Sequence, residues 1–196
     1  MHSPLATIDL QSIRDAIASA DAVVFRLINH GLAAKWLDVL MLAVTTLGVG
    51  LVQAAIGLAV VIAGAVRRRD DLQRMGYAAL AAYAGSGLIS QLVKHFGDRP
   101  RPLLVLFDAR VVGSPLFVQS FPSGHATTAF AAAFVWAAFL PRARWGFYGL
   151  AGLAALSRVY LGAHFPLDVV YGAFLGAVIG IGSARLFQPR RSEDIK

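Results

Sequence analysis

The chain has 196 residues, of which 57% are hydrophobic and only 15% are charged, and its mean hydropathy is +0.63. A chain of this length cannot bury so much apolar surface in one water-facing core, so the composition favours an integral membrane protein over a soluble domain. The chain has no cysteine, which excludes a disulfide framework, a thiolate metal site and a catalytic thiol.

The formal net charge is +7, which in a soluble protein would indicate nucleic-acid binding. Here the basic residues lie mostly between or after apolar segments, a distribution typical of topology signals. We therefore expect membrane lipids, and no nucleic acid, as partners. The N-terminal stretch MHSPLATIDLQSIRDA lacks the basic region and apolar core of a secretory signal peptide, so the spans themselves are expected to drive insertion.

Residues 1–34 have the pattern of an amphipathic helix. The apolar residues recur at roughly helical spacing, at Leu10, Ile13, Ile17, Val24, Leu27 and Ile28. The charged residues that interrupt them are Asp9, Arg14, Asp15, Asp21 and Arg26. Because these charges argue against a membrane span, the pattern predicts a helix that lies in the membrane interface.

Residues 35–187 contain five apolar stretches that could cross a bilayer. Their bounds are Val39–Val66, Met75–Val93, Ser123–Leu140, Trp145–Leu161 and Pro166–Phe187. The predicted fold class is therefore all-α, a polytopic membrane helix bundle of about five transmembrane helices. Residues 35–187 would form the membrane domain, and residues 188–196 a polar cytoplasmic tail.

Small residues on two of these stretches predict close helix packing. Gly172, Gly176 and Gly180 recur every fourth residue on the last stretch, and a smooth strip of this kind lets two helix backbones approach. The third stretch has a comparable row of alanines, at Ala126, Ala129, Ala133 and Ala137.

The loops separate by charge. The regions after the first, third and fifth stretches are basic, with Arg67, Arg68, Arg69, Arg74, Arg142, Arg144, Arg185, Arg190, Arg191 and Lys196. Five spans place these regions on one face, which the positive-inside rule makes cytoplasmic. Three other polar clusters then share the periplasmic or extracellular face of the cell membrane: KHFGDRPRP, the start of SGHATTAF, and the turn LGAHFPLD.

The first polar cluster supplies cations. It contains Lys94, Arg99 and Arg101, and prolines follow both arginines. Such residues often only anchor a helix to anionic head groups. Proline fixes the local backbone, however, so these arginines extend from a rigid turn, and the guanidinium group suits forked contacts with phosphate oxygens.

The second cluster, Pro122–His125, has the features of a helix start that binds an anion. Ser123 is placed near the N-cap, where the first backbone N–H groups lack partners within the helix. Gly124 would permit close approach of a tetrahedral group, and His125 would stand beside it. An ordinary helix cap explains the serine alone, but not the three residues together.

The third cluster runs from Ser157 to Asp168 and contains Arg158 and His164. Pro166 suits the first turn of the last helix, which puts His164 at its entrance and Asp168 four residues further on. A carboxylate there can orient the imidazole and support positive charge on it. Asp168 could also be only a favourable charge at a helix N-terminus, and Arg158 only an anchor, but ionisable residues near membrane depth are costly unless they function or pair.

Two histidines, one carboxylate, several cations and a serine-glycine helix start suit phosphoryl transfer through a covalent histidine intermediate. Fixed cations and backbone donors can stabilise the charge that spreads over the three equatorial oxygens. No zinc-protease motif, carboxylate cluster or cysteine–histidine spacing is present, so we expect neither a metal nor another cofactor.

Three motifs resemble those of the type 2 phosphatidic acid phosphatase family. They are K-x6-RP at Lys94–Pro102, PSGH at Pro122–His125, and SR-x5-H-x3-D at Ser157–Asp168, and the resemblance covers roughly residues 35–185. It implies His164 as nucleophile, Asp168 as its orienting partner and His125 as general acid and then base. It further implies phosphate binding by Lys94, Arg101, Ser123, Gly124 and Arg158. The six-residue spacing selects Arg101 over Arg99, which is left as a possible auxiliary contact.

The expected function is that of a membrane lipid phosphatase, similar to small bacterial undecaprenyl-diphosphate phosphatases. Undecaprenyl diphosphate is the leading substrate, and phosphatidylglycerophosphate, phosphatidic acid and the phosphates of lipid A are alternatives. A lipid phosphotransferase would use the same residues. A protein that only binds or flips anionic lipids would need the cations but neither histidine. The sequence does not indicate an oligomeric state.

Overall fold

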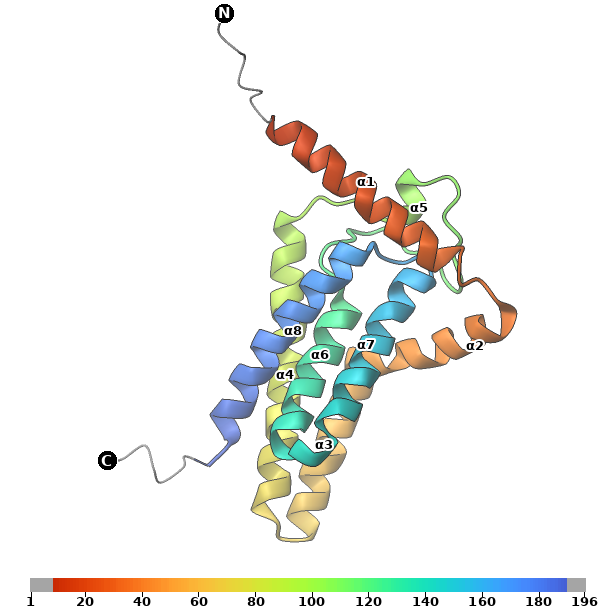
Figure 1. Cartoon of the computed structure of the whole chain (residues 1–196). Helices are drawn as coiled ribbons and strands as arrows, with labels where there is room; N and C mark the ends of the chain where they lie inside the picture. Colours follow the sequence, from red (N-terminus) through yellow and green to blue (C-terminus); the bar gives the residue numbers. More distant parts are fainter. Residues whose placement is uncertain (1–8, 190–196) are drawn as a thin grey trace, which may run out of the picture.

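Residues 9–189 are described by a computed structural model, and they form a bundle of helices (Figure 1). In chain order the helices are α1 (Leu10–Asn29), α2 (Lys35–Val44), the 3-10 turn η1 (Thr45–Gly48), α3 (Gly50–Val66), α4 (Asp70–Phe96), α5 (Pro102–Val105), α6 (Gly124–Phe139), the 3-10 turn η2 (Pro141–Ala143), α7 (Arg144–Tyr160) and α8 (Pro166–Phe187). The described part of the chain contains no strand, so the predicted all-α class is confirmed. Most of the predicted tail, residues 190–196, and residues 1–8 lie outside the described residues.

Helix α6 is the centre of the bundle and packs against α4, α7 and α8. Its contact with α8 depends on the predicted glycine strip. A Cβ atom added at Gly172, Gly176 or Gly180 would collide with a backbone carbonyl oxygen of α6 or of its N-cap residue. The two helices therefore meet backbone to backbone, which confirms the close packing predicted from the glycine spacing.

The predicted stretch 39–66 is not one straight helix. It is divided into α2 with η1 and α3, which meet at an angle of 56°, and α2 leaves the bundle sideways in Figure 1. Val49 has an extended backbone at the break, and the hydroxyl of Thr46 donates to the carbonyl of Ala43. A Cβ at Gly48 would lie 2.9 Å from the Cβ of His125, so the break seats η1 against the start of α6.

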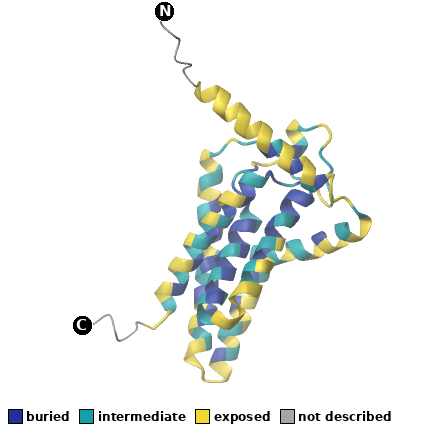
Figure 2. Ribbon diagram, viewed as in Figure 1, coloured by how far each residue is buried: buried dark blue, intermediate teal, exposed yellow. Residues whose placement is uncertain are grey.

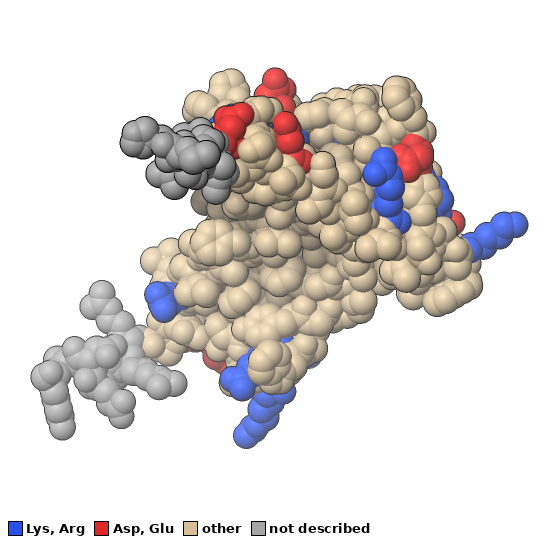
Figure 3. Space-filling model, turned by 45° about the horizontal axis from the view of Figure 1, so that its top comes forward, with Lys and Arg blue, Asp and Glu red and all other residues tan. Residues whose placement is uncertain are grey.

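The outer surface of the bundle is apolar. Figure 2 shows buried residues along the inner faces of the long helices and exposed residues outside, and the exposed face of α8 carries Val170, Tyr171, Phe174, Val178 and Ile181. In Figure 3 the charged side chains leave a broad uncharged surface between them. By length and apolarity, α8 can cross a membrane alone, and α2–η1 with α3 passes the same test as a bent pair.

Helix α1 lies across one end of the bundle, near α5 and the starts of α6 and α8 (Figure 1). Its apolar residues Leu10, Ile17 and Leu27 are exposed, as the amphipathic pattern predicts, but its inward face is partly polar. Asp21 and Asn29 are buried there beside Phe25. Local hydrophobic spacing identified Asp21 only as an interruption, because its partners lie far away in the sequence.

Candidate active site

The three polar clusters meet at the end of the bundle that α1 covers. Lys94 lies in the last turn of α4, and Arg101 lies just before α5. Ser123 is the N-cap residue of α6, as predicted, and Gly124 and His125 form its first turn. Arg158 lies in the last turn of α7, Asp168 lies in the first turn of α8, and His164 occupies the loop between these two helices. The fold thus brings together residues that are spread over most of the chain.

His164 and Asp168 are buried side by side. The Nδ1 atom of His164 lies 3.8 Å from Oδ2 of Asp168, too far for a direct hydrogen bond. The hydroxyl of Ser120 lies between them, donating to Asp168 Oδ2 at 2.5 Å and lying 3.4 Å from His164 Nδ1. The backbone N–H of Phe165 also donates to Oδ2, at 2.9 Å. Two donors, the Ser120 hydroxyl and the Phe165 N–H, therefore orient the carboxylate on the side that faces the histidine.

Ser120 is part of the site that sequence reasoning missed. Its side chain is completely buried, and its backbone N–H donates to the carbonyl of Arg99 at 2.8 Å. The residue precedes the PSGH motif by two positions. No spacing rule distinguishes it from any other loop serine, because its partners come from other segments of the chain.

Arg101 holds the loops around the other edge of His164. The guanidinium group donates to the carbonyl oxygens of Val118 and Ala163, each at 2.7 Å. One of its nitrogens, Nη1, also lies 3.3 Å from Nε2 of His164. Nε2 therefore faces a fixed cation, while Nδ1 faces Ser120 and Asp168.

Burial keeps the imidazole of His164 neutral. The pKa of His164 is lowered to about 4, mainly by burial, with the positive charges of Arg101 and Arg158 adding to the effect and Asp168 opposing it. A neutral imidazole has a free lone pair, which a nucleophile requires.

Two buried polar groups near the start of α6 lack partners within residues 9–189. They are the hydroxyl of Ser123 and Nε of Arg158. The Nη1 atom of Arg158 donates to the hydroxyl of Thr45 at 2.9 Å, across the bend between α2 and α3. Buried polar atoms are costly without a partner, so these two atoms indicate a site for a ligand that carries acceptor oxygens.

A cavity of about 230 Å³ opens beside Arg158. Its wall includes His125 and Arg158, together with Thr45 and loop residues such as Gly162 and Ala163. A Cβ at Gly124 would meet no atom within 4 Å, so the backbone there is open to a bulky group. Lys94 donates to the carbonyl of Gln119 at 2.9 Å and is thereby held at the same end of the bundle.

Arg99 does not join the predicted phosphate-binding cations. Its Nη1 donates to Oδ1 of Asp168 at 2.7 Å, and its Nη2 donates to Asp21 of α1. The two arginines that the spacing rule distinguishes therefore lie in different environments. Arg101 contacts the imidazole of His164, whereas Arg99 contacts the carboxylate behind it.

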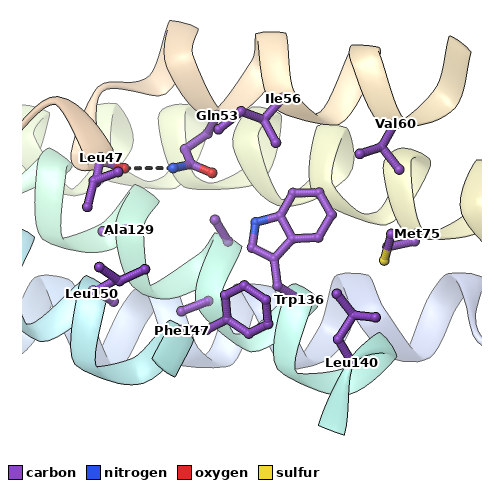
Figure 4. Close-up of a pocket in the computed structure, with 13 residues that line it drawn as sticks. Leu47, Gln53, Ile56, Val60, Met75, Ala129, Trp136, Leu140, Phe147 and Leu150 are labelled. Atoms are coloured by element: carbon purple, nitrogen blue, oxygen red, sulfur yellow. Dashed lines mark hydrogen bonds between the residues drawn. The ribbon is translucent and has the colours of Figure 1, made fainter. Parts of the chain in front are cut away.

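A second cavity, of about 350 Å³, lies between α3, α6 and α7 and is almost entirely apolar (Figure 4). It begins at Leu47 and Ala129, one helical turn after His125, and continues past Trp136 to Met75 and Leu140. The amide of Gln53 donates to the carbonyl of Leu47 at 2.7 Å at the near end. An apolar space thus extends from beside the polar site along the bundle.

The fold and the site define a helical membrane protein with a buried, histidine-containing polar centre at one end of its bundle. Residues 76–192 match the family described as the PAP2 superfamily, and the chain belongs to this family. The resemblance inferred from the three motifs is thus confirmed.

Three known proteins illustrate the similarity. Lipid A 1-phosphatase of Rhizobium johnstonii is 38% identical over 108 residues, 52% of this chain and 43% of that protein. Decaprenylphosphoryl-5-phosphoribose phosphatase of Mycobacterium tuberculosis is 38% identical over 116 residues, 58% of this chain and 60% of that protein. The chain therefore spans only about half the length of these relatives. The crystal structure of a transmembrane PAP2 type phosphatidylglycerolphosphate phosphatase from Bacillus subtilis superposes with a TM-score of 0.72 at 25% identity, covering 93% of this chain and 89% of that one.

Proposed function

We propose that this protein is a lipid phosphatase that removes a terminal phosphate through a phosphohistidine intermediate. The observation that carries the proposal is the buried His164, whose Nδ1 edge faces Ser120 and Asp168 and whose Nε2 faces Arg101. The unpartnered Ser123 hydroxyl and Arg158 Nε support it, because a phosphate group supplies the acceptor oxygens that these atoms lack.

In the first step, Nε2 of His164 attacks phosphorus while the bond from phosphorus to the leaving oxygen breaks. His125 gives its proton to that oxygen, and the lipid leaves as an alcohol or a lower phosphate. In the second step, His125 takes a proton from water, which attacks phosphorus and breaks the N–P bond to release inorganic phosphate. Asp168 supports the positive charge on His164 while it forms the new bond.

Five residues are proposed to hold the phosphate: Lys94, Arg101, Ser123, Gly124 and Arg158. Their charges and donors would stabilise the equatorial oxygens in the transition state, a role that a metal ion fills in other phosphoryl-transfer enzymes. Activity is therefore expected to survive EDTA and to be inhibited by vanadate. Loss of activity on chelation, with recovery on adding a metal, would contradict this part of the proposal.

The site is proposed to face the periplasm or the extracellular side. Arg67, Arg69, Arg142 and Arg185 lie at the end of the bundle opposite to α1 and α5 (Figure 1). A basic end of this kind is usually cytoplasmic. Helix α1 would then lie in the outer interface with its exposed leucines and isoleucines against lipid.

Undecaprenyl diphosphate is proposed as the leading substrate. The cavity beside His125 would hold the phosphate, and the apolar cavity that starts one turn away on α6 would receive part of a hydrocarbon chain. The relatives named above act on other lipids, by their names lipid A, a decaprenyl phosphoribose and phosphatidylglycerolphosphate, so these chemistries are the alternatives.

The test is phosphate release by purified protein across a lipid panel. The panel contains undecaprenyl diphosphate, phosphatidylglycerophosphate, phosphatidic acid and lipid A, and the kcat/KM values are compared. The highest value is expected with undecaprenyl diphosphate, and a higher value with another lipid would reassign the substrate. Transfer of phosphate to a second lipid would indicate a phosphotransferase, and lipid binding without any turnover would contradict the enzymatic proposal.

A further inference from the structure

We propose that Arg99 and Asp21 are positioning residues, which hold the carboxylate of Asp168 in the orientation that serves His164 and which connect this pair to helix α1. The inference rests on the proposed function and extends it. It concerns two residues that the three motifs do not specify: Arg99, at a variable position of the first motif, and Asp21, on a helix that the motifs do not include.

Asp21 is a buried carboxylate whose two oxygens are both used. Its side chain is only 1% exposed. Oδ1 accepts from the backbone N–H of Leu167 at 3.0 Å, and Oδ2 accepts from Arg99. A buried carboxylate is costly unless it is paired and hydrogen-bonded, so this arrangement fixes α1 to the first turn of α8.

Arg99 is held between two carboxylates and an aromatic ring. Nη2 contacts Asp21, and Nη1 contacts Oδ1 of Asp168 at 2.7 Å. Its guanidinium carbon lies 4.5 Å from the centre of the Phe165 ring, and that ring packs against Phe25 of α1 at 5.5 Å. The planar guanidinium group therefore has one allowed orientation, set jointly by α1 and the loop that carries His164.

In this arrangement the two carboxylate oxygens of Asp168 have different hydrogen-bond partners. Oδ1 is occupied by Arg99, which leaves Oδ2 for Ser120, the Phe165 N–H and the edge of His164. Without Arg99, a fully buried oxygen would lose its partner, and the carboxylate could rotate to recover one. Arg99 thus determines which oxygen faces the imidazole.

The pKa of His164 provides a second readout of the proposed arrangement. The ionisable groups that surround the imidazole are Arg101 before α5, His125 of α6, Arg158 of α7 and Asp168 of α8, with Lys94 of α4 acting on Asp168. Ser120 completes the shell. Arg99 and Asp21 lie behind Asp168, so removing the cation should raise the pKa of His164, whereas removing the anion should lower it.

The experiment measures kcat and kcat/KM against pH for full-length Arg99→Gln and Asp21→Asn. We expect a kcat loss of about 10- to 100-fold for Arg99→Gln and a smaller loss for Asp21→Asn, with KM nearly unchanged. The acidic limb of the profile should move by roughly 0.5 pH unit or more, upward for Arg99→Gln and downward for Asp21→Asn. Arg99→Lys, which keeps the charge, should keep the wild-type limb.

The matched control is Arg26→Gln. Arg26 pairs with Asp108 at 2.7 Å and also fixes α1 to a loop, but it does not contact the histidine pair. This variant should keep the wild-type profile. Shifts in the same direction for both test variants, an unshifted limb, or an equal effect of Arg26→Gln would overturn the positioning role.

Two further measurements distinguish a folding defect, a failure of the proposed function and a failure of the positioning role. If Arg99→Gln does not fold, NMR titration of histidine-labelled Asp21→Asn must still show a lowered His164 pKa, and an unchanged value would overturn the proposal. Wild-type protein provides the reference for the proposed function. Absence of phosphate release by wild-type protein would refute that function, whereas an active wild type with unshifted variants would refute only the role of Arg99 and Asp21.

Discussion

The middle of the α6–α8 helix pair and the end that carries the site are held together by different forces. Along the middle of the pair, glycines of α8 meet backbone carbonyls of α6, and only shape complementarity and dispersion hold the contact. At the end that carries the site, the same helices are joined to α1 and the loops by charged and polar groups around Asp168. Damage to the first region should therefore affect folding, and damage to the second should affect chemistry.

The largest expected effect tests the polar end. His164→Ala should reduce phosphate release by about 10⁴-fold or more, because the proposed nucleophile is lost. Its thermal unfolding in detergent should remain close to that of the wild type. A variant with near-normal turnover would exclude His164 as the nucleophile.

The next effect concerns the unpartnered hydroxyl of Ser123. Ser123→Ala should lower kcat by about 10²-fold if the hydroxyl donates to the transition state, while stability should hardly change since no hydrogen bond is lost. Ser90 on α4 is a matched control, because its hydroxyl is also buried and without a partner within residues 9–189. Ser90→Ala should keep wild-type kinetics, and equal losses for both serines would point to packing instead.

Alanine substitutions at two glycines of α8, one inside the glycine strip and one outside it, should change the stability in opposite directions. Gly176→Ala would place a Cβ against the carbonyl of Thr127 and should destabilise the protein by about 1–3 kcal/mol. Gly182, also on α8, has open space around it, so Gly182→Ala should stabilise the helix by about 0.5–1 kcal/mol. Thermal unfolding measures both, and changes of the same sign would contradict the packing described for α6 and α8.

The smallest effect sharpens the role of the apolar cavity. Leu150 of α7 lines it and is half-exposed, so Leu150→Trp should fill part of the space. We expect the KM for a long-chain lipid to rise several-fold, about the effect of losing one or two methylene contacts. The KM for a small soluble phosphate ester should not change. Leu153→Trp, at a similarly exposed position outside the cavity, is the control. An equal rise in KM for both variants would exclude the cavity as a chain-binding site.

The long helices and the close α6–α8 contact could be predicted from the sequence, because both depend on residues that are near one another in the chain. Apolar stretches located the long helices, and the spacing of Gly172, Gly176 and Gly180 predicted a close contact, because both features repeat with the period of a helix. The motif residues came together as expected because they lie at helix ends on one face. The break at Val49 was missed, since an uncharged stretch has no hydropathy signal at a bend.

The support around the histidine could not be found in this way. Ser120, Thr45 and Asp21 act through partners that are distant in sequence, and Asp21 even opposed the amphipathic pattern of its own helix. Their roles follow from burial, because each polar group must find a partner wherever the fold places one. Arg99 is left by the sequence as a possible auxiliary contact, since a spacing rule does not show which oxygen a guanidinium group contacts.

The bond from Leu167 to Asp21 has a consequence for biosynthesis. Its two residues are separated by 146 positions in the chain, so the helix that is translated first receives its partner only when the last helix is in place. A chain still missing α8 lacks both Asp168 and the partner that keeps Asp21 buried. The polar centre can therefore be assembled only after α8 has joined the bundle.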